Sequence, residues 1–278
     1  MSEKTMGVAA CVVVACLQDV SLGFPAGSHL EVATSSPYRS SSSLEKRFNR
    51  SARGPCYNKY RHYFDIYERH LSHLRGTDAH VLEIGNYAGG GLSLWRWYFG
   101  EAATIYGLDL ITANRAYEKD PSYGMPDRIF VGNQADPKFW KWFKTAVPRL
   151  DVVLDDGGHS YEEQSTTVKE LLPFLNPGGV ILIEDVHQGG PYEGDKFSQF
   201  VVDTFIRGRH GLNNLEFGKE SSPTSTMQAD IAEVAFHPYV IAIHKLPRRR
   251  QEMLVRTRGS YNVPGKCWGI NSSRDEVC

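Results

Sequence analysis

The sequence predicts a doubly wound α/β fold built on a mostly parallel, seven-stranded, Rossmann-like sheet. Short and almost wholly apolar segments alternate with helix-length segments between residues 81 and 184. Strands of this kind are typical of a parallel sheet whose two faces are both covered by helices. A glycine-rich turn follows the first of these strands, and acidic residues follow several later ones. In such sheets ligands usually bind at the carboxyl ends of the strands.

The individual elements follow from the spacing of apolar residues. Aromatic and leucine residues recur at steps of three and four from Tyr60 to Leu74, which predicts an amphipathic helix ending near Gly76. Apolar runs then predict strands at residues 81–84, 104–109, 128–131, 151–155 and 180–184. The segments between and after them predict helices at residues 92–99, 139–146, 162–175 and 197–207.

The end of the folded region shows a different pattern. Residues 231–245 contain two apolar segments that are separated only by a short turn at His237 and Pro238. No crossover helix fits into so short a connection, so the two strands must be antiparallel. We therefore expect the sheet to end in a C-terminal antiparallel hairpin.

Three regions are expected along the chain. Residues 1–54 are expected to be a disordered leader, because residues 21–54 are rich in Ser, Pro, Gly and Arg without an apolar period. Within the leader, the apolar run at residues 6–17 is a candidate signal segment. Residues 55–247 are expected to form the folded domain, and residues 248–278 a solvated basic tail. The compartment is left open. The cytoplasm is the default, whereas a secretory route would explain the apolar run and the glycosylation sequons at Asn49 and Asn271.

Composition excludes several classes of protein. The 278 residues include 31 basic and 32 acidic ones, a formal net charge of minus one, so no global field favours nucleic acid or an anionic membrane. The apolar run at residues 6–17 is too short to span a bilayer. None of the five cysteines has C-x-x-C spacing, which argues against a cysteine zinc site or a disulfide-built core. A small-molecule partner is expected, and the oligomeric state is left open.

Acidic residues follow two strands that are expected to be neighbours. Asp155, Asp156 and His159 belong to L-D-D-G-G-H after one strand, and Glu184 and Asp185 to I-E-D after the next. If these strands lie side by side in a parallel sheet, four carboxylates and an imidazole converge at one edge. Carboxylates so close would repel one another, and at least one would take up a proton unless a cation holds them ionised. The sequence therefore predicts a divalent-cation site.

The turn after the first strand predicts an adenosine-containing ligand. Glycine at Gly85, and again from Gly89 to Gly91, lets the backbone turn sharply and approach a ligand closely. The spacing differs from the G-x-G-x-x-G of dinucleotide folds. Asp109 ends the second strand, where an acid accepts hydrogen bonds from ribose hydroxyls, and Glu83 is placed to meet a cationic end of the ligand. Together these residues suggest S-adenosylmethionine.

Further polar residues are expected to complete the cofactor site. Gln134, Asp136 and Tyr161 lie on predicted loops at the same edge of the sheet, where they would frame the adenine. Two roles remain open for Asp155, which either caps the following turn or contacts the amine of the cofactor.

These motifs resemble those of the class I S-adenosylmethionine-dependent methyltransferases. The segments that carry the resemblance are E-I-G at 83–85, L-D at 108–109, G-N-Q-A-D at 132–136, L-D-D-G-G-H at 154–159, N-P-G-G at 176–179 and I-E-D at 183–185. More narrowly, residues 58–245 resemble the metal-dependent sugar O-methyltransferases of macrolide biosynthesis, the mycinamicin and tylosin type. The resemblance implies that Asp156, Glu184 and Asp185 bind Mg²⁺ and that His159 is the catalytic base. The chain departs from the family pattern in its glycine turn and in a shorter amino-terminal region.

The expected reaction is methyl transfer to a hydroxyl of a small polyhydroxylated acceptor, such as a sugar or glycoside. A neutral alcohol is a poor nucleophile, so its proton must leave as the new bond forms. A divalent cation makes bound hydroxyls more acidic. An imidazole is suited to taking up the proton, and His159 is preferred over His187 for that role.

Three alternatives to this function stay open at the level of sequence. The acidic edge could serve a metal-dependent hydrolase on the same fold, in which a bound water is the nucleophile. The altered glycine turn would also suit a non-catalytic binding protein. Methylation of nucleic acid would require the basic tail at residues 248–250 to fold over the site.

Overall fold

The computed structural model describes residues 43–50, 54–124, 126–190, 192–207 and 230–247. The candidate signal segment at residues 6–17, the sequon at Asn271 and the basic tail at residues 248–278 lie outside the described residues. All described residues belong to one compact unit. The placement of the domain boundary at residue 55 stays a prediction.

The described chain starts with a helix that the sequence analysis did not anticipate. α1 spans Ser43–Arg50, within the segment expected to be a disordered leader, so that prediction was wrong for these residues. Leu44 is fully buried, and the ring of Phe48 packs against that of Phe64 with centroids 5.1 Å apart. Leu44 and Phe48 are four residues apart, so their side chains lie on the same side of α1. This short helix therefore adds apolar side chains to the core.

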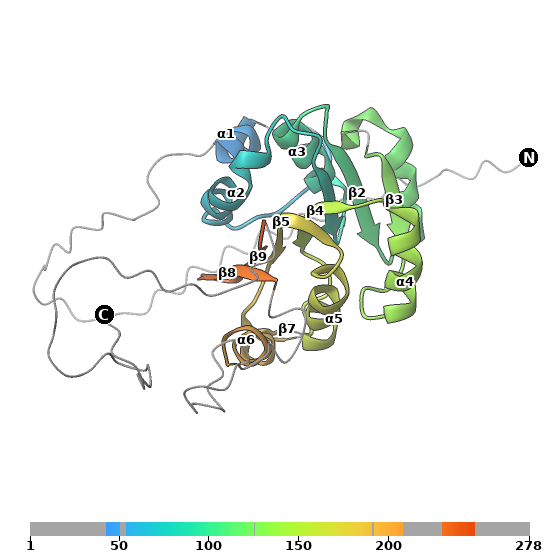
Figure 1. The fold of residues 1–278 in the computed structure, drawn as a ribbon. Helices are drawn as coiled ribbons and strands as arrows, with labels where there is room; N and C mark the ends of the chain where they lie inside the picture. The colour runs from blue at the N-terminus through green and yellow to red at the C-terminus, as the bar shows by residue number, and fades with distance from the viewer. Residues whose placement is uncertain (1–42, 51–53, 125, 191, 208–229, 248–278) are drawn as a thin grey trace, which may run out of the picture. The chain divides into compact units, whose positions relative to one another are not determined.

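The central sheet confirms the predicted fold class. Its order is β3-β2-β1-β4-β5-β9-β8, in which the first five strands are parallel and β9 runs antiparallel to both β5 and β8 (Figure 1). The strands are β1 His80–Ile84, β2 Thr104–Asp109, β3 Arg128–Val131, β4 Leu150–Asp155, β5 Leu175–Ile183, β8 Ile231–His237 and β9 Val240–Lys245. The expected C-terminal hairpin is present as β8 and β9.

Successive residues of each strand point to opposite faces of the sheet, so these apolar strands place apolar side chains on both faces. Helices cover both faces. One apolar cluster joins the sheet to α1, α2 (Tyr63–Leu71) and α3 (Gly90–Phe99). The other joins it to α4 (Pro137–Ala146), α5 (Tyr161–Leu171) and α6 (Gly194–Val201). In β4, for example, Val152 belongs to the first cluster and Val153 to the second.

Several short elements were not predicted. 3₁₀ turns at Ser72–Leu74, Thr112–Lys119 and Pro121–Tyr123 follow α2 and β2, and the two-residue strands β6 (Gln188–Gly189) and β7 (Tyr192–Glu193) pair beyond β5. The helix expected at residues 197–207 starts earlier, at Gly194, and continues as a π-helix over Val202–Arg207. Segments this short contain too few residues to show a hydrophobic period.

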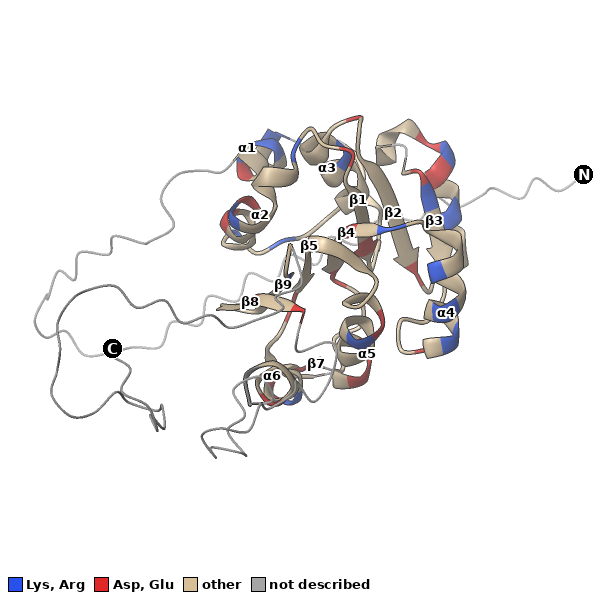
Figure 2. Ribbon diagram, in the orientation of Figure 1, with Lys and Arg blue, Asp and Glu red and all other residues tan. Residues whose placement is uncertain are grey.

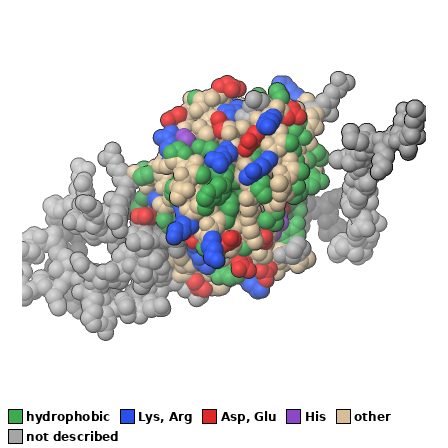
Figure 3. All heavy atoms as spheres, turned by 90° about the vertical axis from the view of Figure 1, so that its right-hand side faces the viewer, with side chains coloured by type: hydrophobic (Ala, Val, Ile, Leu, Met, Phe, Trp, Pro, Cys, Tyr) green, Lys and Arg blue, Asp and Glu red, His purple; other side chains and the backbone are tan. Residues whose placement is uncertain are grey.

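The face of the molecule that carries α4 presents basic side chains interspersed with apolar and acidic ones (Figure 3). On this face, the mixture of charges matches the near-zero net charge of the chain. Within the part of the chain that the structure describes, no helix has both the length and the apolar character needed to cross a membrane.

Candidate functional site

The carboxyl ends of β1, β4 and β5 are tied together by main-chain hydrogen bonds. The amide of Asp156 donates to the carbonyl of Ile84 over 3.0 Å, and the amide of Glu184 donates to the carbonyl of Asp155 over 2.9 Å. Parallel strands that end in register bring the residues that follow them to one edge. The predicted convergence of the two acidic segments is therefore present, and Figure 2 shows acidic residues at the carboxyl ends of the strands.

The glycine turn lies directly against the first acidic segment. Gly85 has a φ of 84°, and a Cβ at this position would be only 2.0 Å from the main-chain oxygen of Asp156. Gly91, at the start of α3, faces the Oε1 atom of Glu83, which a Cβ would approach to 2.0 Å. Gly89 has a φ of 78° and forms the N-cap of α3. These glycines are required by backbone conformation and by close packing.

A cavity of about 610 Å³ opens beside this turn. Its walls include Gly85, Asp109, Gln134, Asp156 and His159, which were all assigned to the site from the sequence. Pockets of 300–1,000 Å³ are typical of small-molecule and cofactor sites. The glycine turn, the end of β2 and the acidic segment therefore share one ligand-sized cavity.

Glu83 supplies an unpaired acceptor at the wall of the cavity. Its side chain is buried, Oε1 accepts a hydrogen bond from Nε1 of Trp95 over 2.8 Å, and Oε2 has no partner among the described residues. Burial raises the pKa of Glu83 to about 7, although the ammonium of Lys59 opposes the rise. A buried carboxylate oxygen without a partner fits a ligand that brings a positive charge.

Asp109 fixes the shape of the glycine turn as well as lining the cavity. Its Oδ2 accepts hydrogen bonds from the amides of Asn86 and Tyr87 over 2.9 and 3.1 Å, and its Oδ1 accepts one from the amide of Ile111 over 2.9 Å. Because a carboxylate has about four acceptor positions, Asp109 retains capacity for a ligand hydroxyl.

Of the four other residues predicted at the cofactor site, Gln134 lines the cavity, whereas Asp136, Asp155 and Tyr161 do not. Gln134 lines the cavity and donates from Nε2 to both carboxylate oxygens of Asp155 over 3.1 and 3.2 Å. Asp155 is buried and does not line the cavity; burial raises its pKa to about 7. Asp136 caps α4 by accepting from the amide of Lys138 over 2.8 Å, and it too lies outside the cavity lining. Tyr161 packs on Phe200 instead of framing the cavity.

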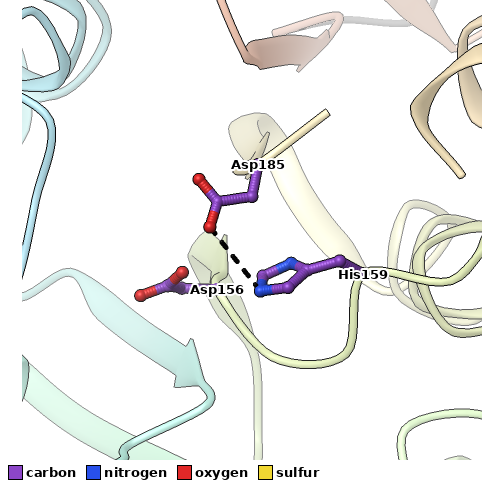
Figure 4. A group of neighbouring side chains, drawn as sticks. All are labelled: Asp156, His159 and Asp185. Atoms are coloured by element: carbon purple, nitrogen blue, oxygen red, sulfur yellow. Dashed lines mark ion pairs between the residues drawn. The ribbon is translucent and has the colours of Figure 1, made fainter. Parts of the chain in front are cut away.

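Three side chains at the cavity rim form a group able to hold a metal ion. Asp156, His159 and Asp185 each offer one ligand atom, and these atoms lie within 4.8 Å of one another (Figure 4). The Nε2 atom of His159 is 3.6 Å from Oδ2 of Asp185. The Nδ1 atom of His159 is buried without a hydrogen-bond partner in the described chain. Two carboxylates and an imidazole are a donor set that fits a divalent cation.

Glu184, the third predicted metal ligand, is placed differently. It is fully buried, its Oε2 lies 2.7 Å from Nζ of Lys59, and its Oε1 accepts a hydrogen bond from the hydroxyl of Tyr67 over 2.8 Å. Burial raises the pKa of Glu184, while Lys59 and Tyr67 act in the opposite direction. Glu184 is therefore absent from the group of possible ligands among the described residues.

His187, the second candidate base, lies outside the metal group. Its ring packs against Tyr192 and Tyr239 with centroids 4.0 and 4.7 Å apart, and its Nδ1 is 3.1 Å from the carbonyl of Gln188. The Nε2 atom of His159 instead faces Asp185, and the His159 ring stacks on Tyr192 with centroids 5.1 Å apart.

Sequence reasoning missed Lys59, Tyr63 and Tyr67, which all contact the predicted acids. They precede or belong to α2, far from the acidic segments in sequence, and Tyr63 and Tyr67 were assigned only to an apolar helix face. A hydroxyl on that face was the one signal that could have suggested a polar partner, since a buried Tyr usually finds one.

Comparison with known proteins supports the fold and shows a similarity to one domain family. Residues 82–186 match a family described as a methyltransferase domain. This match agrees with the resemblance to class I methyltransferases. The chain is also structurally similar to MycE methyltransferase from the mycinamycin biosynthetic pathway, solved in complex with Mg and SAH, with a TM-score of 0.58 and 24% identity over 74% of this chain and 54% of that one.

Curated relatives of the methyltransferase domain include two O-methyltransferases. The chain is 28% identical to 8-demethyl-8-alpha-L-rhamnosyl tetracenomycin-C 2'-O-methyltransferase of Streptomyces olivaceus over 66% of its length and 50% of the relative. It is 34% identical to demethylmacrocin O-methyltransferase of Streptomyces fradiae over 62% of its length and 45% of the relative. The match thus spans about half the length of these relatives.

Proposed function

We propose that this chain is an S-adenosylmethionine-dependent, divalent-metal-assisted O-methyltransferase that acts on a small polyhydroxylated acceptor, a sugar or glycoside. The observation that carries the proposal is the position of Asp156, His159 and Asp185 at the rim of the cavity beside the glycine turn. The names of the relatives, which are sugar or macrolide O-methyltransferases, support the same class of acceptor.

The cavity fits the methyl donor at both of its ends. Asp109, at the end of β2, is placed to accept hydrogen bonds from ribose hydroxyls. The unpaired Oε2 of Glu83 is placed to meet the positively charged amine of the methionine part. Gly85 lines the cavity between these two residues, and its missing side chain lets the glycine turn lie against the main chain of Asp156.

The metal group would act on the acceptor side of the cavity. Asp156 and Asp185 would hold a divalent cation, which would supply Lewis acidity to a hydroxyl of the acceptor. His159 is placed to remove the hydroxyl proton as the oxygen bonds to the methyl carbon and the carbon–sulfur bond breaks. Tyr63 orients Asp185 by donating a hydrogen bond to its Oδ1 over 2.6 Å.

A second cavity suggests where the acceptor binds. It has a volume of about 360 Å³, shares Asp156 and Asp185 with the larger cavity, and is walled by Phe48, Tyr60 and Tyr63. Tyr60 is 48% exposed, so its ring is available to a ligand. Aromatic faces beside carboxylates suit a sugar, which presents both C–H faces and hydroxyls.

Isothermal titration with S-adenosylmethionine, with and without Mg²⁺, tests the proposal. We expect saturable binding of the methyl donor, and Mg²⁺-dependent formation of S-adenosylhomocysteine when rhamnosides are offered as acceptors. Replacing Asp109 should weaken binding of the methyl donor and lower the rate of methyl transfer, whereas a metal-dependent hydrolase would keep its activity. Folded protein that binds no methyl donor at millimolar concentration would refute the proposal.

A further inference from the structure

Tyr87 is held in a left-handed backbone conformation within the glycine turn. Its φ is 44°, a value that glycine adopts freely and that is a genuine outlier for a bulky residue. Among the described residues other than glycine, only Asp185 and Tyr239 also have a positive φ. The turn is the segment in which the chain departs from the family pattern. Strained residues of this kind persist only where their surroundings fix them, and they cluster at functional sites.

Hydrogen bonds on both sides fix the main chain of Tyr87. Its amide donates to Oδ2 of Asp109 over 3.1 Å. Its carbonyl oxygen accepts hydrogen bonds from Nδ2 of Asn114 over 3.2 Å and from the hydroxyl of Tyr117 over 2.9 Å. Both of these donors belong to the 3₁₀ turn Thr112–Lys119, which follows β2. Three contacts from outside the glycine turn therefore hold this peptide in its strained conformation.

The side chain of Tyr87, in contrast, has no such support. Tyr87 is 67% exposed, and in the part of the chain that the structure describes its phenol forms no hydrogen bond and its ring contacts no other aromatic ring. If the turn needed only the backbone conformation, glycine would provide it without strain. The strained conformation therefore serves to present the side chain.

Tyr87 and two neighbours make the mouth of the larger cavity apolar. Tyr87, Leu110 and Ile111 are 67%, 64% and 53% exposed, the highest values among the large hydrophobic side chains of the described chain, and all three residues line this cavity. Asp109 lies between them, because its Oδ2 bonds to the amide of Tyr87 and its Oδ1 to the amide of Ile111. Large apolar side chains that are exposed around one cavity indicate a surface that a ligand covers.

We propose that Tyr87 is a binding residue for the methyl donor and that its aromatic ring packs against the bound donor on the Asp109 side of the cavity. This inference rests on the function proposed above, because it takes S-adenosylmethionine as the ligand of the larger cavity. Adenosine presents a flat base and a ribose with C–H groups, and both pack well on the face of an aromatic ring. The hydrogen bond from the amide of Tyr87 to Asp109 keeps the ring next to the carboxylate that accepts the ribose hydroxyls.

Nitration of the wild-type full chain with tetranitromethane, in the absence of metal, tests this contact without any substitution. The reagent modifies exposed tyrosine rings, and peptide mass spectrometry locates the product. Saturating S-adenosylmethionine should slow nitration of Tyr87 by about threefold or more, because a ligand in such a pocket covers most of the surface that it contacts. Tyr239 is the matched control, since it has a φ of 61°, is 42% exposed and lines neither of the two cavities described above. Its nitration should not change.

Calorimetry of S-adenosylmethionine binding, again without metal, separates the ring from the turn that carries it. Y87A should weaken binding by about three- to tenfold, the range for the loss of one aromatic contact. Y87F keeps the ring and should bind as the wild type does, and so should Y239A. Y87G lacks the ring but relieves the left-handed strain, so it should unfold at a higher urea concentration than Y87A and still bind the donor weakly.

The outcomes separate this inference from the proposed function. If Tyr87 stays open to nitration at saturating donor, or if Y87A binds the donor as tightly as the wild type, the role of Tyr87 is overturned and the proposed function stands. Equal weakening by Y87A and Y239A would also overturn it, as an effect of general destabilisation. Wild-type protein that binds no S-adenosylmethionine would refute both. If circular dichroism shows that Y87A does not fold, nitration of the wild type decides.

Discussion

The hydroxyl of Tyr63 contacts Asp185 at both its side chain and its main chain. It donates a hydrogen bond to Oδ1 over 2.6 Å and accepts one from the amide of Asp185 over 3.2 Å. Asp185 has a φ of 55°, a conformation that is uncommon for residues other than glycine. Tyr63 thus holds Asp185 in a strained conformation from the first turn of α2, in a different layer of the fold.

Removing this hydroxyl should therefore weaken the metal site. We expect Y63F to lower the affinity for Mn²⁺ by about 10- to 100-fold, as loss of a residue that orients a metal ligand typically does. Binding of S-adenosylmethionine without metal should change little. Y98F is the matched control, because the hydroxyl of Tyr98 bonds to Glu68 away from the cavity. Equal Mn²⁺ affinities of Y63F and the wild type would contradict the orienting role of Tyr63.

Gly85 should tolerate no side chain. G85A combines an unfavourable φ of 84° with a Cβ placed 2.0 Å from the carbonyl oxygen of Asp156. G100A is the matched control, because Gly100 has a φ of 90° but nothing within 4 Å of the added Cβ. The control should lose about 1–3 kcal/mol of unfolding free energy from conformation alone, because a φ of 90° with a ψ of −179° is a conformation adopted almost only by glycine. We expect G85A to lose more in urea unfolding and to bind S-adenosylmethionine more weakly; identical losses would show that the contact with Asp156 is unimportant.

Asp109 should contribute to binding of the methyl donor. We expect D109N to weaken S-adenosylmethionine binding in calorimetry by about 1.5–3 kcal/mol, the range for a hydrogen bond to a charged group. The control is D127N. Asp127 likewise accepts from a strand amide, that of Ile105 over 2.7 Å, but lies outside the cavity lining. If D127N reduced donor affinity as much as D109N, the effect would reflect general destabilisation.

Glu83 should make the stability of the ligand-free protein fall as the pH rises from about 4.5 to about 7. Burial raises its pKa from 4.5 to about 7, so the folded state holds a proton that the unfolded state releases in this range. The contribution is fully present below pH 4.5 and is lost as the pH rises through 7, with a slope of up to about 1.4 kcal/mol per pH unit. E83Q should remove this slope in urea unfolding at several pH values; an unchanged slope would show that Glu83 is ionised throughout.

The same group predicts proton release when the methyl donor binds. A positive ligand charge near Oε2 favours the ionised form of Glu83, so binding at pH 6 should expel a proton. Calorimetry in buffers with different ionisation enthalpies measures that proton. The wild type should show the release and E83Q should not; release of the same size in E83Q would place the ligand's charge elsewhere.

A histidine chain between α2 and the C-terminal hairpin should make the fold sensitive to acid. Nδ1 of His70 is 2.7 Å from Nε2 of His244, and Nε2 of His70 is 2.8 Å from Nε2 of His237. Burial, followed by the two neighbouring imidazoles, lowers the pKa of His70 to about 3. Below pH 6.5 the unfolded chain therefore binds a proton that the folded chain does not, and stability falls as the pH drops from 6.5 toward 3.

Replacing His70 should reduce this loss. We expect the unfolding free energy of H70Q to decline less between pH 6.5 and 4.5 than that of the wild type, by up to about 1.4 kcal/mol per pH unit. H73Q, which changes an exposed histidine just beyond the same helix, should decline as the wild type does. Parallel curves for H70Q and the wild type would show that the His70 imidazole is protonated in the folded state.

The sequence by itself determined the sheet and the edge at which the site lies. Apolar strands separated by helices have few ways to pack, and parallel strands place the residues that follow them at one edge. Asp156, His159 and Asp185 therefore meet as expected, and Gly85 and Asp109 reach the same cavity.

Only the tertiary structure decided how the acids are shared. Asp136 became a helix cap, Asp155 and Glu184 were buried against protein donors, and Lys59 and Tyr63 entered the site from another layer. The position of a strand end depends on the backbone pattern, which the sequence displays. The partner of a buried carboxylate depends on which side chains from distant elements reach it, and that is settled when the helix layer packs onto the sheet.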